Sequence, residues 1–111
     1  MPGDENISLS VPDQDKRIVY AADNLFPAWP NPARQGQTVT FGYHLNQADA
    51  VTLDLLDVRG REVQNIMPQQ NVSAGHHEQR FALPQLKPGT YFYRLTTSSG
   101  LVRSHMIQVQ D

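Results

Sequence analysis

The sequence predicts an all-β fold, an Ig-like antiparallel β-sandwich of about seven strands. Three observations predict it. Apolar and polar residues alternate along several short segments, which is the period of a strand with one buried face. Turn-forming residues separate these segments at short intervals. No segment of ten or more residues shows the 3.6-residue period of an amphipathic helix. Short strands and turns at this spacing are typical of a small sandwich.

The clearest alternation lies in residues 37–45, where four apolar residues share one face. They are Val39, Phe41, Tyr43 and Leu45. Residues 51–55 repeat the pattern and predict a second strand. Residues 57–60 close a hairpin, in which Gly60 is expected to supply a positive φ and Asp57 to act as a turn residue. Residues 62–67 then form the return strand.

The second half of the chain continues in the same way. Residues 68–74 are polar and are expected to form a loop, and residues 75–83 alternate as a strand with the odd-numbered residues on one side. Residues 86–89 are typical of a type II turn, with proline at its second position and glycine at its third. Residues 90–97 and 101–109 are the last two predicted strands. The residues expected to specify turns are Gly60, Pro88 and Gly89.

Residues 1–24 are predicted to be a linker or lead-in with a first strand at 17–21, and residues 25–111 a single domain. Three prolines between positions 27 and 32 exclude a helix and a central strand there, because each removes a backbone donor. The segment is therefore expected to be extended near a sheet edge or end. We expect Phe26 and Trp29 to fill the bottom of the core.

Composition excludes several classes of function. The 111 residues have a formal net charge of -2, which gives no basic surface for nucleic acid or anionic membrane. No apolar run approaches the roughly 20 residues of a membrane-spanning helix. The chain has no cysteine, which excludes disulfides and thiolate metal sites. Its first residues are acidic and polar and lack the apolar stretch of a secretory signal, so a signal for export is expected upstream.

Four segments occur in an order and spacing that resemble a known family. They are Pro30-Asn31-Pro32-Ala33, residues 51–63, residues 74–77 and residues 86–95. Together they resemble the type A C-terminal sorting domain of the type IX secretion system of Bacteroidota and related bacteria. The resemblance covers residues 25–111. The strand pattern of residues 51–95 is also similar to the Ig-like domain of flagellar hook-capping proteins.

The resemblance implies a secretion signal and cell-surface attachment module of a larger secreted protein, without enzymatic activity or a cofactor. The upstream cargo domain crosses the inner membrane on its own signal, and the outer-membrane translocon then recognises the folded end domain. In many members a surface sortase removes the domain and joins the cargo to a lipopolysaccharide. The implied location is secreted or cell surface, by way of the periplasm and outer membrane.

Recognition is expected at the last strand, whose exposed edge can pair with a partner through main-chain hydrogen bonds. Members of the family often carry a lysine before the final apolar pair, and here two other basic residues precede that pair. The candidate recognition residues are Pro30, Asn31, Pro32, Arg103, His105, Ile107 and Val109. For the Pro-Asn-Pro motif we favour a role in fixing how the linker joins the sandwich over direct contact with a receptor.

Catalytic and metal sites are not predicted. His76 and His77 are adjacent on a strand and point to opposite faces, so they cannot easily share one ion. No Gly-x-Ser-x-Gly motif accompanies the serine, histidine and aspartate residues of a possible hydrolytic triad. No pattern places two carboxylates across a cleft, as glycoside cleavage would require.

Two other functions stay open. A carbohydrate-binding module uses exposed aromatic rings, and the sequence offers Trp29, Tyr91, Phe92 and Tyr93. We favour the interpretation that alternate members of residues 91–93 are core and that Trp29 seals it. The other is a structural Ig-like spacer of an extracellular hydrolase.

Overall fold

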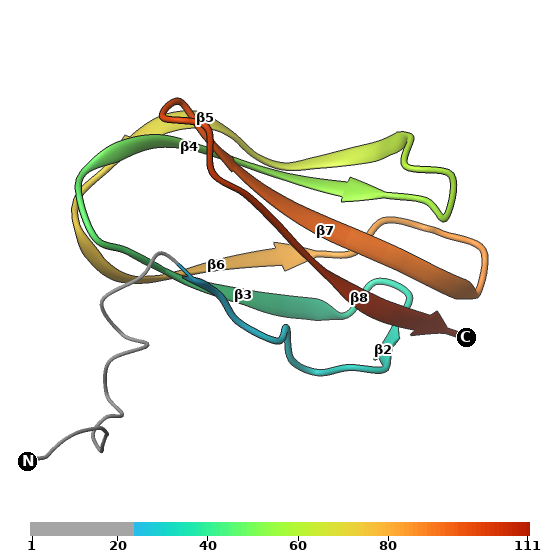
Figure 1. Ribbon diagram of the computed structural model, residues 1–111. Helices are drawn as coiled ribbons and strands as arrows, with labels where there is room; N and C mark the ends of the chain where they lie inside the picture. Colours follow the sequence, from blue (N-terminus) through green and yellow to red (C-terminus); the bar gives the residue numbers. More distant parts are fainter. Residues whose placement is uncertain (1–23) are drawn as a thin grey trace, which may run out of the picture.

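The computed structural model describes residues 24–111, which form a sandwich of two β-sheets (Figure 1). The smaller sheet has the order β1-β3-β6, with β1 at Asn24–Leu25, β3 at Thr38–Leu45 and β6 at Gly75–Ala82. The larger sheet has the order β2-β8-β7-β4-β5, with β2 at Ala33–Arg34, β8 at Val102–Gln110, β7 at Gly89–Thr97, β4 at Asp49–Leu56 and β5 at Glu62–Val72. Paired neighbours are antiparallel except β2 and β8, which are parallel.

The predicted all-β sandwich is confirmed, and the described residues contain no helix. They form eight strands instead of about seven, because β1 and β2, of two residues each, add to the sheets beside β3 and β8. The strand expected at residues 17–21 lies outside the described residues. Residues 25–111 form one sandwich with one core.

The core lies between the inner faces of the two sheets. Its fully buried members alternate along β3, β4, β7 and β8, as the period of two predicts. Phe41 of β3 and Tyr93 of β7 join the sheets, with ring centroids 4.9 Å apart in an edge-to-face arrangement. Ile107 and Val109 of β8 are buried in the same core. The last strand is therefore held by packing as well as by its ladder to β7.

The hairpin between β4 and β5 follows the sequence prediction. Gly60 has a φ of 82°, and its amide donates to the carbonyl of Asp57 at 2.9 Å. The carboxylate of Asp57 accepts the amide hydrogens of Arg59 and Arg61 at 2.8 and 3.0 Å. These bonds lower the pKa of Asp57 below its ordinary value, and the bond from the Arg61 amide has the largest effect. Asp57 is thus a turn residue, as expected.

The type II turn predicted at residues 86–89 is wrong. Gly89 has a φ of 151°, whereas the third position of such a turn needs about +80°. Gly89 is instead the extended first residue of β7, opposite Val109 of β8. The hydroxyl of Tyr91 donates to the carbonyl of Lys87 at 2.7 Å, and this bond stabilises the bend that precedes β7.

The loop predicted for residues 68–74 is also wrong, because β5 continues to Val72. Its register with β4 shifts between the pairs Leu53–Met67 and Val51–Gln70, and Pro68 falls within that shift. An edge strand tolerates a proline at such an irregularity, since no neighbour needs its amide hydrogen. The polar residues that suggested a loop are the exposed side chains of this edge strand.

Phe26 and Trp29 do not fill the bottom of the core, contrary to the prediction. The chain continues from β1 along β3, with Trp29 bridged to Thr40. In this segment Leu25 and Ala28 are the residues buried in the core. Trp29 is 55% exposed. Phe26 lies on the outer face of the small sheet, 3.5 Å from where a Cβ on Gly42 would be. The small sheet thus carries these two rings on its outer side.

Candidate recognition site

The terminal strand β8 has one free edge. On one side it pairs with β7 along its whole length, from Val102 to Val109. On the other side β2 pairs only with its end, through Ala33 opposite Val109 and Arg34 opposite Gln110. Figure 1 shows β2 as a short arrow beside the end of the long β8. The rest of this edge has no strand hydrogen-bonded to it within residues 24–111.

The side chain of Asn31 acts as a neighbour for part of that edge. Its Nδ2 donates to the carbonyl of Met106 at 3.1 Å, and its Oδ1 accepts the amide hydrogen of Gln108 at 3.0 Å. A carboxamide offers the same donor and acceptor as a peptide group, so it replaces one residue of a paired strand. Pro30 and Pro32 restrict the backbone on both sides of Asn31.

Two further side chains bind the leading segment, which we define as residues 25–32. The hydroxyl of Tyr93 donates to the carbonyl of Phe26 at 2.6 Å and accepts the amide hydrogen of Ala28 at 2.7 Å. Burial raises the pKa of Tyr93 to about 12. The Nε2 atom of His105 lies 2.7 Å from the carbonyl oxygen of Leu25, which can only accept. The leading segment is therefore bound to β7 and β8 by Tyr93, His105 and Asn31.

A comparison with protein families decides what kind of domain this is. Residues 27–110 match the family described as a secretion system C-terminal sorting domain. The chain belongs to this family. The match covers most of the chain and confirms the resemblance to the type IX sorting domain. This sorting domain is a signal for type IX secretion, which implies a larger cargo chain, the secretion machinery as partner, and export to the cell surface or extracellular space.

Solved structures of low sequence identity bear only on the fold of this sorting domain, and of the three named below the β-glucosidase has a TM-score above 0.5. A β-glucosidase from Listeria innocua in complex with glucose aligns with a TM-score of 0.53 and 16% identity over 80% of this chain and 16% of its own. The alkylpurine DNA glycosylase AlkC from Pseudomonas fluorescens, bound to DNA with an abasic site analogue, aligns with a TM-score of 0.48 and 9% identity. The alignment covers 80% of this chain and 30% of the glycosylase. CopC from Methylosinus trichosporium aligns with a TM-score of 0.44 and 17% identity, over 78% of this chain and 90% of CopC.

The sorting domain spans less than a third of the first two chains, 16% and 30% of their lengths. No curated protein matches it. The similarity to hook-capping proteins stays a prediction.

The predicted recognition residues fall into two groups. Pro30, Asn31 and Pro32 meet the last strand through the bonds of Asn31, and the exposed Arg103 and His105 lie on the same strand. Ile107 and Val109, in contrast, are 0% and 3% exposed. In the folded domain these two residues hold β8 in place and offer no surface to a partner.

Sequence reasoning missed the contacts of Tyr93, Met106 and Gln108. Tyr93 sits in an alternating strand and is indistinguishable there from any core aromatic residue. The contacts of Met106 and Gln108 with Asn31 use their backbone groups, which carry no sequence signal. The asparagine between two prolines is the one sequence feature that indicates a special contact of this segment.

The two adjacent histidines lie on opposite faces, as predicted. His76 faces outward, with its ring 5.7 Å from that of Phe26. His77 faces the other way and stacks on Tyr43 at 5.5 Å. No group of three histidine, cysteine or acidic residues within residues 24–111 is placed to hold a metal ion. The same residues contain no helix that is long and apolar enough to span a membrane.

Proposed function

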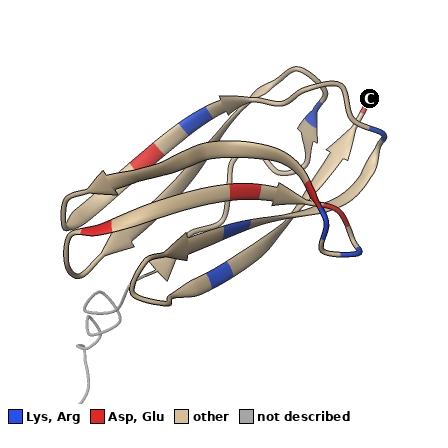
Figure 2. Ribbon diagram, turned by 90° about the horizontal axis from the view of Figure 1, so that it is seen from above, with Lys and Arg blue, Asp and Glu red and all other residues tan. Residues whose placement is uncertain are grey.

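We propose that this sorting domain is a pre-folded handle, which the outer-membrane translocon of the type IX system binds at β8 and the leading segment. The observation that carries the proposal is the free edge of β8 in a member of a sorting family. The side chains of Asn31, Tyr93 and His105 fix the leading segment against β8 and its neighbour β7, so the segment and β8 are presented together. Figure 2 shows Lys and Arg dispersed among Asp and Glu over the strands, which favours recognition by shape and backbone over a field of one sign.

The domain acts without covalent chemistry of its own and serves as a surface attachment module. A surface sortase acts before Leu25, because the backbone from Leu25 onward is hydrogen-bonded to the sandwich and proteases prefer unpaired backbone. The domain reaches the surface by way of the periplasm and outer membrane, on a signal peptide that belongs to the cargo.

A reporter fusion tests the sorting role. Residues 1–111 are placed behind a periplasmically exported reporter in a type IX-secreting bacterium, and the reporter is measured outside the cells and in the periplasm. Deletion of residues 106–111 is expected to leave the reporter inside. Val58→Ala is the matched control, because Val58 is 67% exposed in the hairpin after β4 and touches neither β8 nor the leading segment. Normal surface display of the deletion variant contradicts the proposal.

A second candidate function is glycan binding, and one observation favours it. Trp29 is 55% exposed on the outer side of the small sheet, where an indole ring can stack on a sugar. Two of the other three proposed rings argue against it, since Tyr93 is fully buried and Tyr91 packs against the core. The third, Phe92, is half-buried on the larger sheet and does not extend a row from Trp29 on the small sheet. Retention of the chain on an insoluble polysaccharide, lost in Trp29→Ala, is the result that supports this function. If the wild-type chain is not retained on the polysaccharide, the glycan-binding function is refuted.

A further inference from the structure

The hydrogen-bonding groups of β8 divide between its two sides. Along a strand, successive residues direct their N–H and C=O groups to alternate sides. The carbonyl of Leu101 accepts from the amide of Thr97 just beyond β8, so odd-numbered residues face β7. The Met106 carbonyl and the Gln108 amide bond to Asn31, so even-numbered residues face the free edge.

Part of this edge is already occupied. Asn31 takes two groups, the Gln110 carbonyl accepts the amide hydrogen of Gln35 at 3.2 Å, and the Val102 carbonyl accepts from Nη1 of Arg103 at 3.0 Å. The groups without a partner within residues 24–111 are Val102 N–H, Ser104 N–H, Ser104 C=O and Met106 N–H. The last three follow one another along the edge, and the Val102 N–H lies beyond the occupied Val102 carbonyl.

The other long edges of the sandwich carry protection against strand addition. On β6, Nε2 of Gln79 donates to the carbonyl of Arg80 at 3.0 Å and so covers an edge-facing group. On β5, Pro68 and shifts of register interrupt the edge. Natural sheets use such devices to prevent pairing with foreign strands. On β8, Nη1 of Arg103 covers the Val102 carbonyl in the same way, but the groups from Ser104 N–H to Met106 N–H have no such cover within residues 24–111. The register of β8 with β7 also runs without a shift.

We infer that the export machinery recognises this domain by adding one extended segment of its own as a new strand along residues 102–106. This inference rests on the proposed sorting function and names the binding mode. Main-chain hydrogen bonds to the four free groups give affinity, and alternate side chains give specificity.

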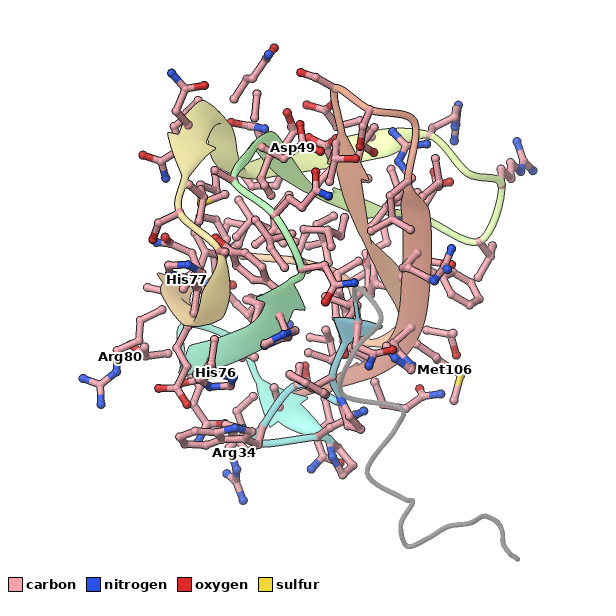
Figure 3. All side chains as sticks on the ribbon, turned by 60° about the vertical axis from the view of Figure 1, so that its left-hand side comes forward. Arg34, Asp49, His76, His77, Arg80 and Met106 are labelled. Atoms are coloured by element: carbon pink, nitrogen blue, oxygen red, sulfur yellow. The ribbon has the colours of Figure 1, made fainter. Side chains whose placement is uncertain are left out.

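The side chains beside the edge define the chemistry of that segment. Val102 and Met106 are 53% and 49% exposed on the outer face of the sheet, with Met106 opposite Phe92. The partner strand therefore presents apolar residues on this face. Arg103 projects from the other face, which favours an acidic residue of the partner there. Figure 3 shows Met106 at the outside of the sandwich, away from His77 and Arg80.

A pair of substitutions at one position tests the backbone contact. The amide hydrogen of Ser104 faces the free edge and takes no part in the β7 ladder, so Ser104→Pro removes it and keeps that ladder. Ser104→Ala removes only the hydroxyl. In the reporter assay Ser104→Pro is expected to lower the exported fraction about tenfold, the equivalent of one lost hydrogen bond to the partner. Ser104→Ala is expected to export like the wild type.

Thermal unfolding of the purified chain shows which variants fold. If Ser104→Pro does not fold, Val102→Pro at the start of β8 replaces it, with Val102→Ala as control. Folded proline variants that export normally, while deletion of residues 106–111 blocks export, refute strand addition and leave the sorting function standing. Export of the deletion variant refutes the sorting function itself.

Amide hydrogen exchange tests the free edge directly in the chain of residues 1–111. The amides of Ser104 and Met106 are expected to exchange fast, and those of Arg103 and His105, which face β7, slowly. Slow exchange at Ser104 at every protein concentration means that residues 1–23 cover the edge. Protection that grows with concentration means that a second copy covers it. Either result overturns the inference.

Discussion

The hydroxyl of Tyr93 offers the sharpest test of how the leading segment is held. Tyr93→Phe removes one oxygen atom and leaves the ring in the core, so it creates almost no cavity. It breaks the bonds to the Phe26 carbonyl at 2.6 Å and the Ala28 amide at 2.7 Å. Because the two partners have no other bond that reaches them from β7, the leading segment is expected to loosen.

The expected loss follows from those two bonds. Each hydrogen bond contributes about 1 kcal/mol, and each buried group left unpaired costs a further ~1–3 kcal/mol unless water reaches it. Since the segment can move outward to water, we expect the free energy of unfolding to fall by roughly 2–4 kcal/mol. For a domain of this size that corresponds to a melting temperature lower by on the order of 10–20 °C.

The matched control is Tyr91→Phe on the same strand. The hydroxyl of Tyr91 donates to the carbonyl of Lys87 at 2.7 Å in an exposed position, where water replaces the lost partner. Its expected cost is below about 1 kcal/mol. Urea unfolding followed by Trp29 fluorescence measures both variants. Equal losses for the two tyrosines, or a Tyr93→Phe loss below about 0.5 kcal/mol, refute the reasoning.

The pKa of Tyr93 gives a second readout of the buried hydroxyl. Burial raises it from 10.0 to about 12, so the folded state holds the proton more tightly than the unfolded state. The contribution of the protonated Tyr93 hydroxyl to the free energy of unfolding is fully present below pH 10. It is lost as the pH rises from about 10 through 12. Two pKa units correspond to roughly 3 kcal/mol. The wild type is therefore expected to lose this stability in alkali, and Tyr93→Phe is expected not to show this step.

Three further outcomes are expected. Asn31→Ala leaves the Met106 carbonyl and the Gln108 amide without their partner, so the free energy of unfolding in urea is expected to fall by about 1–2 kcal/mol. Asn31→Asp can still accept a hydrogen bond but cannot donate one, so its stability is expected to fall between those of Asn31→Ala and the wild type. Gly60→Ala places a Cβ in open space but at a φ of 82°, so backbone strain alone costs about 1 kcal/mol of unfolding free energy. Asp57 has a lowered pKa in the folded state, so its contribution is present above pH 3.8 and is lost as the pH falls below that value; melting temperatures at pH 7 and pH 3 are expected to differ less in Asp57→Asn than in the wild type.

The sequence predicted most strands because one face of each is buried. Alternation in residues 37–45, 75–83 and 90–97 reports that burial directly, and β3, β6 and β7 occupy these positions. The errors occur where burial does not alternate. β5 is an exposed edge strand, so its residues after Met67 have the composition of a loop.

The position of Trp29 shows a second limit. A large aromatic residue in a proline-rich segment suggests core, but the register of that segment against β3 decides which way it points. The bridge from Trp29 to Thr40 places both on the outer face, and the small Ala28 takes the inner position. Register depends on contacts between segments distant in sequence, so no local pattern reveals it.

The candidate site depends on such distant contacts. The side chain of Asn31 meets a carbonyl 75 residues later, and the hydroxyl of Tyr93 meets an amide 65 residues earlier. The sequence could place the candidate recognition strand at the end of the domain, because its alternation and turns are local. It could not show that the segment before the sandwich is bound to that same strand.

This contact has a consequence for how the cargo is carried. His105 bonds to Leu25, so the chain that leads to the cargo leaves the sandwich beside the free edge of β8. A partner strand on residues 102–106 then lies next to Leu25, where the leading segment begins.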